Sequence, residues 1–513
     1  MIGIKAYGGY IPRLRIDRMI IYRNMGWYAP ATITAARGER SFCNWDEDSI
    51  TMAVEASRDC LGENRQGIGS VLLATTTSPF ADRSMSVVLK EALGLPDETY
   101  CAQIGSSQRA GTQALLDGLA RVAAGGGDCL VAASDRRLAR PGAHYEMLYG
   151  DGAAALCLGT EDVIAEFVDS YSISADFVDH YRGEFKPTDY TWEERWVRDA
   201  GYAKIIPRAV KGLLEKAGIG AGEVDLFVYP CIFQAEHRKL AKRLGTTPEK
   251  AAPNLQEQVG ECGCAHPLLM LANALESAKA GQHVVVVGFG QGADALLFRT
   301  TELVEKFRPQ VGVSGYVERK KNVEDYTKFL LFRGMLEPDR GIRAEAPNQT
   351  ALTVLWRERH MLHGLVGGRC EKCGTVQFPM MDVCVNPECR AHHTQKPEPF
   401  ADKPAKVKTF TGDFLSYTVD PPAIYGMVQF EGGGRFMADF TDAELDGVRV
   451  GMPVRMMFRR RYRDKERGFT GYFWKAAPWA GEGAEVRIRF DDRVVVVTGG
   501  AGGLGRSYCL EFA

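Results

Sequence analysis

The chain has 513 residues and a formal net charge of −2, with 45% hydrophobic and 25% charged residues. This length suits about three or four domains, and the near-neutral charge excludes a global field that would draw nucleic acid or a membrane surface. The N-terminus lacks a signal-peptide pattern and no apolar run approaches a membrane span, so we expect a cytoplasmic protein without disulfides.

Residues 1 to about 310 alternate apolar, β-branched runs with runs of helical spacing. Residues 69–79 form a strand-like run that ends at a proline, and 86–96 have helical spacing with a Gly-Leu-Pro stop. Residues 128–135 and 154–159 are expected to form buried strands. This alternation predicts an α/β domain whose sheet is covered by helices on both faces.

One unit occurs twice within this domain. Residues 105–134 and 260–292 share the order of small-residue turn, helix, glycine-rich turn and strand. The repeat divides the domain into halves of about 1–165 and 200–310, and both copies are expected to contribute to one site. The alternative is that any two units of helix, glycine and strand look alike.

The segments 7–18, 109–115 and 150–159, in this order around the repeat, resemble the thiolase superfamily. The resemblance is closest to its 3-hydroxy-3-methylglutaryl-CoA synthase-like and ketoacyl synthase III-like members. It implies a thiolase-like five-layer αβαβα domain, a homodimer and carbon–carbon bond chemistry on coenzyme A thioesters. Family members place a nucleophilic cysteine at the N-terminus of the first repeat helix, and Gln108 occupies that position here.

Because the cysteine is missing, several functions stay open. The main hypothesis is retro-aldol cleavage of an acyl-CoA in a β-oxidation-like degradation route, without an acyl-enzyme. One alternative is an acyltransferase with Claisen chemistry that uses Cys101, Cys262 or Cys264. Further alternatives are a decarboxylating ketosynthase-like domain, in which glutamine replaces the nucleophile, and a non-catalytic acyl-CoA-binding scaffold. The sequence leaves the acyl group and the direction of the reaction open.

Three residues are candidates for the chemistry. Asp82 follows a strand and could serve as a base, or it could cap a helix or pair with Arg83. Gln108 could donate to an oxyanion or merely cap its helix. His266, at the start of the second repeat helix, could donate to a thioester oxygen or simply cap and pack. The aromatic and charged segment 189–202 is expected to form a helix over the pocket or a dimer interface.

Residues 311–356 are charged and predict a helical connector, and a cysteine motif of spacing C-x2-C-x10-C-x4-C follows it. Four thiolates at this spacing suit tetrahedral zinc and leave no position for water, so the zinc would be structural. The predicted ligands are Cys370, Cys373, Cys384 and Cys389.

The region 357–480 continues with short alternating strands and glycine turns, which predict a small all-β barrel. Together with the cysteines it resembles the rubredoxin-like zinc ribbon and OB-fold of proteins that partner thiolase-fold enzymes on acyl-CoA, and it would bind or gate that substrate. The basic, aromatic stretch 455–473 would suit nucleic acid, the phosphates of coenzyme A or a solvated hairpin. Fusion to a thiolase-like domain favours acyl-CoA, so we do not expect nucleic acid.

Residues 488–513 resemble the beginning of a short-chain dehydrogenase, a truncated Rossmann-like start. The turn places glycines where a pyrophosphate could approach the backbone. NAD(P) is expected only if the full dehydrogenase domain is present, where it would act on the same β-carbon. The alternative is a tail that only resembles this motif. The residues that carry it are Thr498, Gly499, Gly503 and Gly505.

Overall fold

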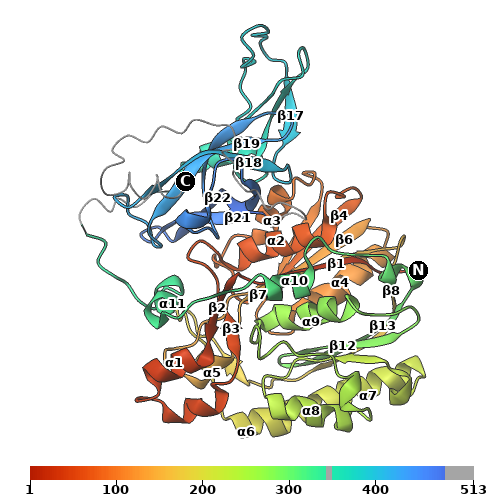
Figure 1. The fold of residues 1–513 in the computed structure, drawn as a ribbon. Helices are drawn as coiled ribbons and strands as arrows, with labels where there is room; N and C mark the ends of the chain where they lie inside the picture. Colours follow the sequence, from red (N-terminus) through yellow and green to blue (C-terminus); the bar gives the residue numbers. More distant parts are fainter. Residues whose placement is uncertain (342–348, 480–513) are drawn as a thin grey trace, which may run out of the picture.

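A computed structural model describes residues 1–341 and 349–479. The N-terminal domain has layers in the order helix, sheet, helix, sheet, helix (Figure 1). Helices α2 and α3 cover one half-sheet, α4 and α9 lie between the two half-sheets, and α7 and α8 cover the second. This arrangement has the five-layer order of helices and sheets that the sequence leads us to expect. The helices are α2 (Ser49–Leu61), α3 (Met85–Ala92), α4 (Ala110–Ala123), α7 (Ile205–Ala217), α8 (Gln234–Arg243) and α9 (His266–Leu275).

The two half-sheets are hydrogen-bonded to each other through β8 and β1. Together they form one nine-stranded sheet in the order β11-β12-β13-β8-β1-β7-β6-β4-β5. The two repeat halves show the same pairing, since β4 and β6 are parallel as β11 and β12 are, and an antiparallel strand follows in each half. The strands are β1 (Gly3–Tyr10), β4 (Ile68–Ala74), β5 (Tyr100–Ile104), β6 (Asp128–Asp135), β7 (Gly152–Gly159), β8 (Ala165–Ser174), β11 (Leu226–Val228), β12 (His283–Phe289) and β13 (Gly292–Thr300).

Smaller elements surround this frame. Strands β2 (Leu14–Asp17) and β3 (Glu39–Ser41) form a separate small sheet with β14 (Lys321–Asn322). Strand β9 (His180–Tyr181) pairs with β10 (Tyr190–Thr191) in a hairpin. Short helices are α1 (Arg18–Met25), α5 (His144–Leu148) and α6 (Glu194–Trp196), which runs into a π-helical turn, Val197–Tyr202. In the part of the chain that the structure describes, no helix is both long and apolar enough to cross a membrane.

The two repeat helices approach each other as the sequence predicts. A Cβ built on Gly111 of α4 would lie 2.2 Å from the carbonyl oxygen of Cys264, next to the start of α9. Such a distance is shorter than a van der Waals contact, so only glycine allows this approach. The close contact brings the beginnings of both helices to one place, where the candidate site lies.

The expected connector, residues 311–356, is helical but not independent of the N-terminal domain. Its first part contains α10 (Gly312–Glu318), β14 (Lys321–Asn322) and α11 (Tyr326–Phe332). Strand β14 pairs with β2, and Arg333 binds the buried Asp151 at 2.7 Å. The second part contains the short helices α12 (Leu352–Arg357) and α13 (Arg359–Leu362). The segment therefore completes the first domain before it leads to the next lobe.

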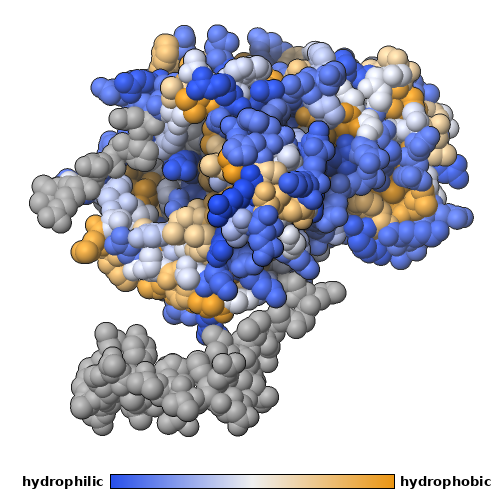
Figure 2. Space-filling view, turned by 90° about the horizontal axis from the view of Figure 1, so that it is seen from above, coloured by the Kyte–Doolittle hydropathy of each residue, from blue (hydrophilic) through white to orange (hydrophobic). Residues whose placement is uncertain are grey.

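The C-terminal lobe consists of a small cysteine-bearing sheet and a barrel-like sheet in the order β20-β19-β18-β21-β22. A bridge between Phe440 and Ala476 brings the two edges of the second sheet together. Figure 2 looks down on this lobe and shows mostly hydrophilic residues with scattered hydrophobic ones. The strands are β15 (Val366–Cys370), β16 (Val376–Gln377), β17 (Gln395–Pro399), β18 (Ala405–Asp413), β19 (Ala423–Phe430), β20 (Arg435–Asp439), β21 (Pro453–Asp464) and β22 (Phe469–Pro478).

Buried ion pairs hold the C-terminal lobe against the N-terminal domain. Arg459 of β21 is fully buried, and its guanidinium lies 3.1 Å from Glu47 and 2.8 Å from Asp442. Lys475 of β22 pairs with the buried Asp46 at 2.9 Å. Burial lowers the pKa of Arg459, but Tyr10 and these carboxylates outweigh it and hold that pKa above its usual value. Buried cations of the C-terminal lobe are therefore neutralised in part by carboxylates of the N-terminal domain.

Candidate active site

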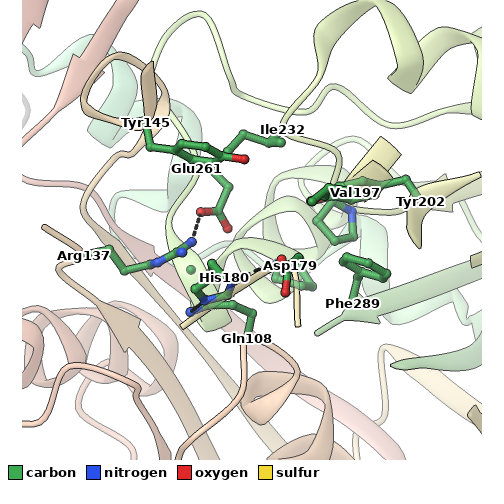
Figure 3. A pocket seen from close by; sticks show the side chains of 13 residues that line it. Gln108, Arg137, Tyr145, Asp179, His180, Val197, Tyr202, Ile232, Glu261 and Phe289 are labelled. Atoms are coloured by element: carbon green, nitrogen blue, oxygen red, sulfur yellow. Dashed lines mark hydrogen bonds and ion pairs between the residues drawn. The ribbon is translucent and has the colours of Figure 1, made fainter. Parts of the chain in front are cut away.

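A small enclosed pocket of about 30 Å³ lies where the start of α4 faces the loop before α9 (Figure 3). One side of it is apolar, and the other carries charged and amide groups. Because both repeat halves line the pocket, the expectation of one shared site agrees with the geometry. The apolar side is made by Val197, Tyr202, Pro230, Ile232, Pro267 and Phe289, and the polar side by Gln108, Arg137, Asp179, His180 and Glu261.

Asp135, at the end of β6, ties the two halves together beneath the pocket. Its carboxylate accepts hydrogen bonds from the Thr76 backbone N–H at 2.7 Å and the Thr76 hydroxyl at 2.9 Å, and from the Cys264 N–H at 2.8 Å. Gly263 has φ +62°, and a Cβ there would lie 2.3 Å from the Asp135 carboxylate. A glycine is therefore needed for the second half to reach this carboxylate.

Gln108 lies just before α4 and points into the pocket (Figure 3). Its amide nitrogen is 3.3 Å from Nε2 of His180 and 3.4 Å from the hydroxyl of Thr76. The amide oxygen is buried and has no hydrogen-bond partner among the described residues. The amide group thus offers a donor where the resemblance places a thiolate.

His180 comes from the β9–β10 hairpin, which closes over the pocket. Its Nδ1 lies 3.0 Å from a carboxylate oxygen of Asp179. If Nδ1 carries the proton and donates it to Asp179, Nε2 is an acceptor and takes the hydrogen bond from the amide N–H of Gln108. An imidazole held in this way by a carboxylate is a competent general base, and the carboxylate stabilises the imidazolium that forms.

Arg137 belongs to the polar side of the pocket and links three elements. It binds Glu261 at 2.7 Å, Asp189 at 2.8 Å and the hydroxyl of Tyr149 at 2.7 Å. Burial raises the pKa of Glu261, an effect that Arg137 partly offsets. Because these partners hold it in place, Arg137 supplies a rigid charged wall.

The structure separates the three residues predicted for the chemistry. Gln108 lines the pocket, whereas Asp82 is exposed in the loop between β4 and α3 and lines none of the cavities described here. His266 is fully buried at the start of α9, where its Nδ1 accepts the Cys262 N–H at 3.3 Å, and it does not line the pocket. Burial lowers the pKa of His266 to about 4, so its ring is neutral at neutral pH.

The three alternative cysteines have the wrong environment for a thiolate. Cys262 and Cys264 are fully buried, and burial raises the pKa of each thiol well above its usual value. Cys101 is half-buried on the edge strand β5, its thiol donates to the Thr99 carbonyl at 3.6 Å, and burial raises its pKa too. A reactive cysteine needs a lowered pKa and access to the substrate.

Sequence reasoning missed the pair His180–Asp179 and the wall residue Arg137. The pair lies in a hairpin without a repeat or a helical period, and only the combination of Asp179, His180 and Arg182 in one aromatic loop signals a site. The segment 189–202, expected to be a helix, is helical only from Glu194, because Tyr190–Thr191 form strand β10. Its helical part lies at the pocket, since Val197 and Tyr202 line it. Asp189, before the strand, binds Arg137 and Arg182.

Comparisons with known proteins cover most of the N-terminal domain. The hydroxymethylglutaryl-CoA synthase of Aeropyrum pernix is 31% identical over 342 residues, which are 65% of this chain and 94% of that protein. The same enzyme of Archaeoglobus fulgidus is 32% identical over 345 residues, 65% of this chain and 98% of that protein. The chain belongs to the hydroxymethylglutaryl-CoA synthase family. This relationship confirms the thiolase-superfamily resemblance of residues 1–310.

Two segments of the chain match models of protein families. Residues 214–299 match the family of 3-oxoacyl-[acyl-carrier-protein] synthase III C-terminal domains, and residues 400–459 match the ChsH2 C-terminal OB-fold domain. The second match confirms the predicted OB-fold. The predicted start of a dehydrogenase domain, with Thr498, Gly499, Gly503 and Gly505, lies outside the described residues.

Solved structures support the fold of the hydroxymethylglutaryl-CoA synthase-like domain. A crystal structure of HMG-CoA synthase complexed with CoA has a TM-score of 0.59 and 16% identity, and the match covers 68% of this chain and 95% of that one. A 3-oxoacyl-(acyl carrier protein) synthase III from Pseudomonas aeruginosa has a TM-score of 0.53 and 19% identity, over 58% of this chain and 98% of that one.

The four cysteines predicted to bind zinc converge in the C-terminal lobe of this hydroxymethylglutaryl-CoA synthase relative. Their sulfur atoms all lie within 4.8 Å of one another, with 3.6 Å between Cys373 and Cys384 and 3.9 Å between Cys370 and Cys389. Sulfurs bound to tetrahedral zinc with bonds of about 2.3 Å lie roughly 3.8 Å apart. The cluster therefore fits a four-cysteine zinc site.

We predict one tightly bound zinc per chain, because all four ligand positions are filled by thiolates. Exchanging Cys373 for serine should abolish stoichiometric zinc in elemental analysis and expose the 366–399 region to proteolysis. The matched control is Cys157→Ser, which alters a cysteine of β7 far from the cluster in sequence and should keep the zinc. Full zinc content in the Cys373 variant would contradict the assignment.

Proposed function

We propose that this chain forms or cleaves a carbon–carbon bond next to the thioester of an acyl-CoA, by aldol-type chemistry without an acyl-cysteine intermediate. The observation that carries the proposal is the contact of 3.3 Å between Gln108 and His180. This contact supports the proposal because a hydrogen-bond donor, at the position where the resemblance expects a nucleophile, lies next to an imidazole that a carboxylate holds.

The relationship to hydroxymethylglutaryl-CoA synthases supports condensing chemistry on acyl-CoA better than the cleavage expected from the sequence. We therefore place condensation first and regard retro-aldol cleavage as its reverse. The pocket supports only the non-covalent form, because the cysteines that an acyltransferase would need are buried with raised pKa values. The acyl-CoA substrate itself is part of the proposal.

Each step is assigned to a residue of the pocket. In the direction of cleavage, Nε2 of His180 takes the proton of the substrate's β-hydroxyl group, and Asp179 stabilises the imidazolium. The bond between the α- and β-carbons breaks, the β-carbon becomes a carbonyl, and the electron pair moves to the thioester enolate. The amide N–H of Gln108 donates to that enolate oxygen, and the α-carbon then takes up a proton. Condensation runs through the same steps in reverse.

The apolar wall sets a limit on what the pocket accepts. Aromatic and aliphatic side chains from three segments close it, with Tyr202 stacked on Phe289 at a centroid distance of 4.5 Å. At the apolar wall the pocket has a volume of about 30 Å³, so the proposal includes a small group on the reacting carbon there. Gln108, Asp179 and His180 also line an adjoining cavity of about 630 Å³, which can take a larger part of the substrate.

Intact mass spectrometry after incubation with short-chain acyl-CoAs is the test. We expect no covalent adduct, because no low-pKa cysteine faces the pocket. The variant Gln108→Cys is the matched control, since it restores a thiol at the family position and should gain an adduct that hydroxylamine removes. An adduct on the unchanged protein that hydroxylamine removes would contradict the proposal and favour the acyltransferase.

A scaffold without activity is the non-enzymatic alternative. The scaffold would be favoured if the chain binds acyl-CoA but shows no turnover in either direction. The two directions are cleavage of a β-hydroxyacyl-CoA and condensation of an acyl-CoA with a carbonyl acceptor. Formation of a new acyl-CoA species, followed by liquid chromatography, would exclude it.

A further inference from the structure

A second cavity lies between the N-terminal domain and the OB-fold lobe. It has a volume of about 360 Å³. Its walls come from Trp45 and Arg136 of the first domain, from residues 331–340 and from the barrel residues 417–419 and 460–465. The cavity therefore exists only because the two lobes are joined.

Seven cationic side chains line this cavity, and only two of them have a carboxylate partner. Arg333 pairs with Asp151, and Lys465 pairs with Glu337. The other five form no ion pair with any residue of the ranges 1–341 and 349–479. These five are Arg136, Arg340, Arg460, Arg461 and Arg463.

Two of the unpaired arginines face each other from opposite lobes. Arg136 donates to the carbonyl of Phe332 at 2.7 Å, and Arg460 donates to the carbonyl of Trp45, so both are held in place without being neutralised. Burial lowers the pKa of Arg460; Asp48 opposes this effect, and the charge of Arg136 adds to it. Both side chains are half-buried, and an anion in the cavity would offset the repulsion between their like charges.

Aromatic rings complete the lining. Trp45, Tyr417 and Tyr462 contribute to the same cavity. Guanidinium groups bind phosphate oxygens in a planar, two-point manner, and aromatic faces stack on nucleobases. A cavity that offers both, with a volume in the range of small-molecule sites, favours a phosphorylated nucleotide over a simple anion.

We propose that the cavity between the lobes binds the phosphorylated adenosine of a nucleotide, with Arg136, Arg460 and Arg463 on its phosphates. Arg136 precedes Arg137 in the chain, and Arg137 lines the candidate active site, so the two sites adjoin. Two sources share this chemistry: the adenosine 3′-phosphate 5′-diphosphate end of coenzyme A and a free or dinucleotide cofactor. For coenzyme A, the inference rests on the proposed function and deepens it.

Isothermal titration of the full chain tests the proposal with four probes: adenosine 3′,5′-bisphosphate, ATP, NADP+ and pyrophosphate. The double variant Arg461→Glu and Arg463→Glu reverses two unpaired, exposed charges on β21. We expect it to weaken nucleotide binding about tenfold or more, because the contact of Arg463 is lost and two negative charges at the cavity repel the phosphates. The double variant Lys406→Glu and Lys408→Glu is the matched control, since both lysines are exposed on β18 and line none of the cavities described here. It should bind like the unchanged protein.

The outcomes separate the sources and the alternatives. Preference for adenosine 3′,5′-bisphosphate, with competition by coenzyme A, identifies the coenzyme A end, and preference for ATP or NADP+ identifies another nucleotide. Equal binding of pyrophosphate and nucleotides, an equal loss in the control variant, or tighter binding of an oligothymidine than of any mononucleotide overturns the proposal. Nucleotide binding without carbon–carbon turnover would leave this inference standing while the proposed function fails.

Discussion

The variant His180→Ala is expected to lower kcat/KM for the carbon–carbon step by about 10²- to 10⁴-fold, the usual contribution of a general base. The imidazole is the group that faces Gln108 across the pocket while a carboxylate holds its other nitrogen. Stopped assays of acyl-CoA products by liquid chromatography measure the loss, and circular dichroism confirms that the variant is folded.

A matched histidine and the partner carboxylate sharpen this test. His283→Ala removes a histidine from the start of β12, the strand end remote from Phe289 at the pocket, and should keep the activity. Asp179→Asn should lose activity as well, because an amide can hold the ring in the wrong tautomer. Full activity of His180→Ala alongside an inactive Gln108→Ala would assign proton transfer to another group, and we would abandon the histidine as base.

The variant Arg459→Met is expected to destabilise the chain by about 3–5 kcal/mol, the usual cost of removing one partner from a buried ion pair. Its side chain is fully buried and lies within 3.1 Å of both Glu47 and Asp442. Without the guanidinium, Glu47 and Asp46 would stay buried with one cationic neighbour fewer. Urea unfolding followed by tryptophan fluorescence measures the change.

The control for this experiment is Arg449→Met, because Arg449 is exposed in the same lobe. It should change the free energy of unfolding by less than about 0.5 kcal/mol. An equally small change for Arg459→Met would mean that the ion pairs do not hold the lobes together. Separate unfolding transitions of the two lobes in the Arg459 variant would show that this residue couples them.

Features that depend on residues close together in the sequence could be predicted from it. The cysteine cluster depends on residues 370–389 alone, so its spacing was sufficient to place four sulfurs around one point. The repeat was equally visible, because each copy carries its own helix, glycine turn and strand. The position of Gln108 followed from its place before the first repeat helix.

Features that depend on long-range contacts could not be predicted. His180 reaches Gln108 only because a hairpin without any periodic pattern folds over the pocket, and Asp189 of the same hairpin binds Arg137. The place of His266 at a helix start left a donor role and a packing role open, and the fold buries this side chain away from the pocket. Burial by distant segments decided both cases.

The ion pairs between the lobes also bear on how the gene could change. Asp46 and Glu47 of one lobe bind Lys475 and Arg459 of the other, so exchange of one lobe for a homologue without these charges would leave buried charges unpaired in the lobe that remains. We therefore expect a change of charge at these positions in one lobe to require a matching change in the other.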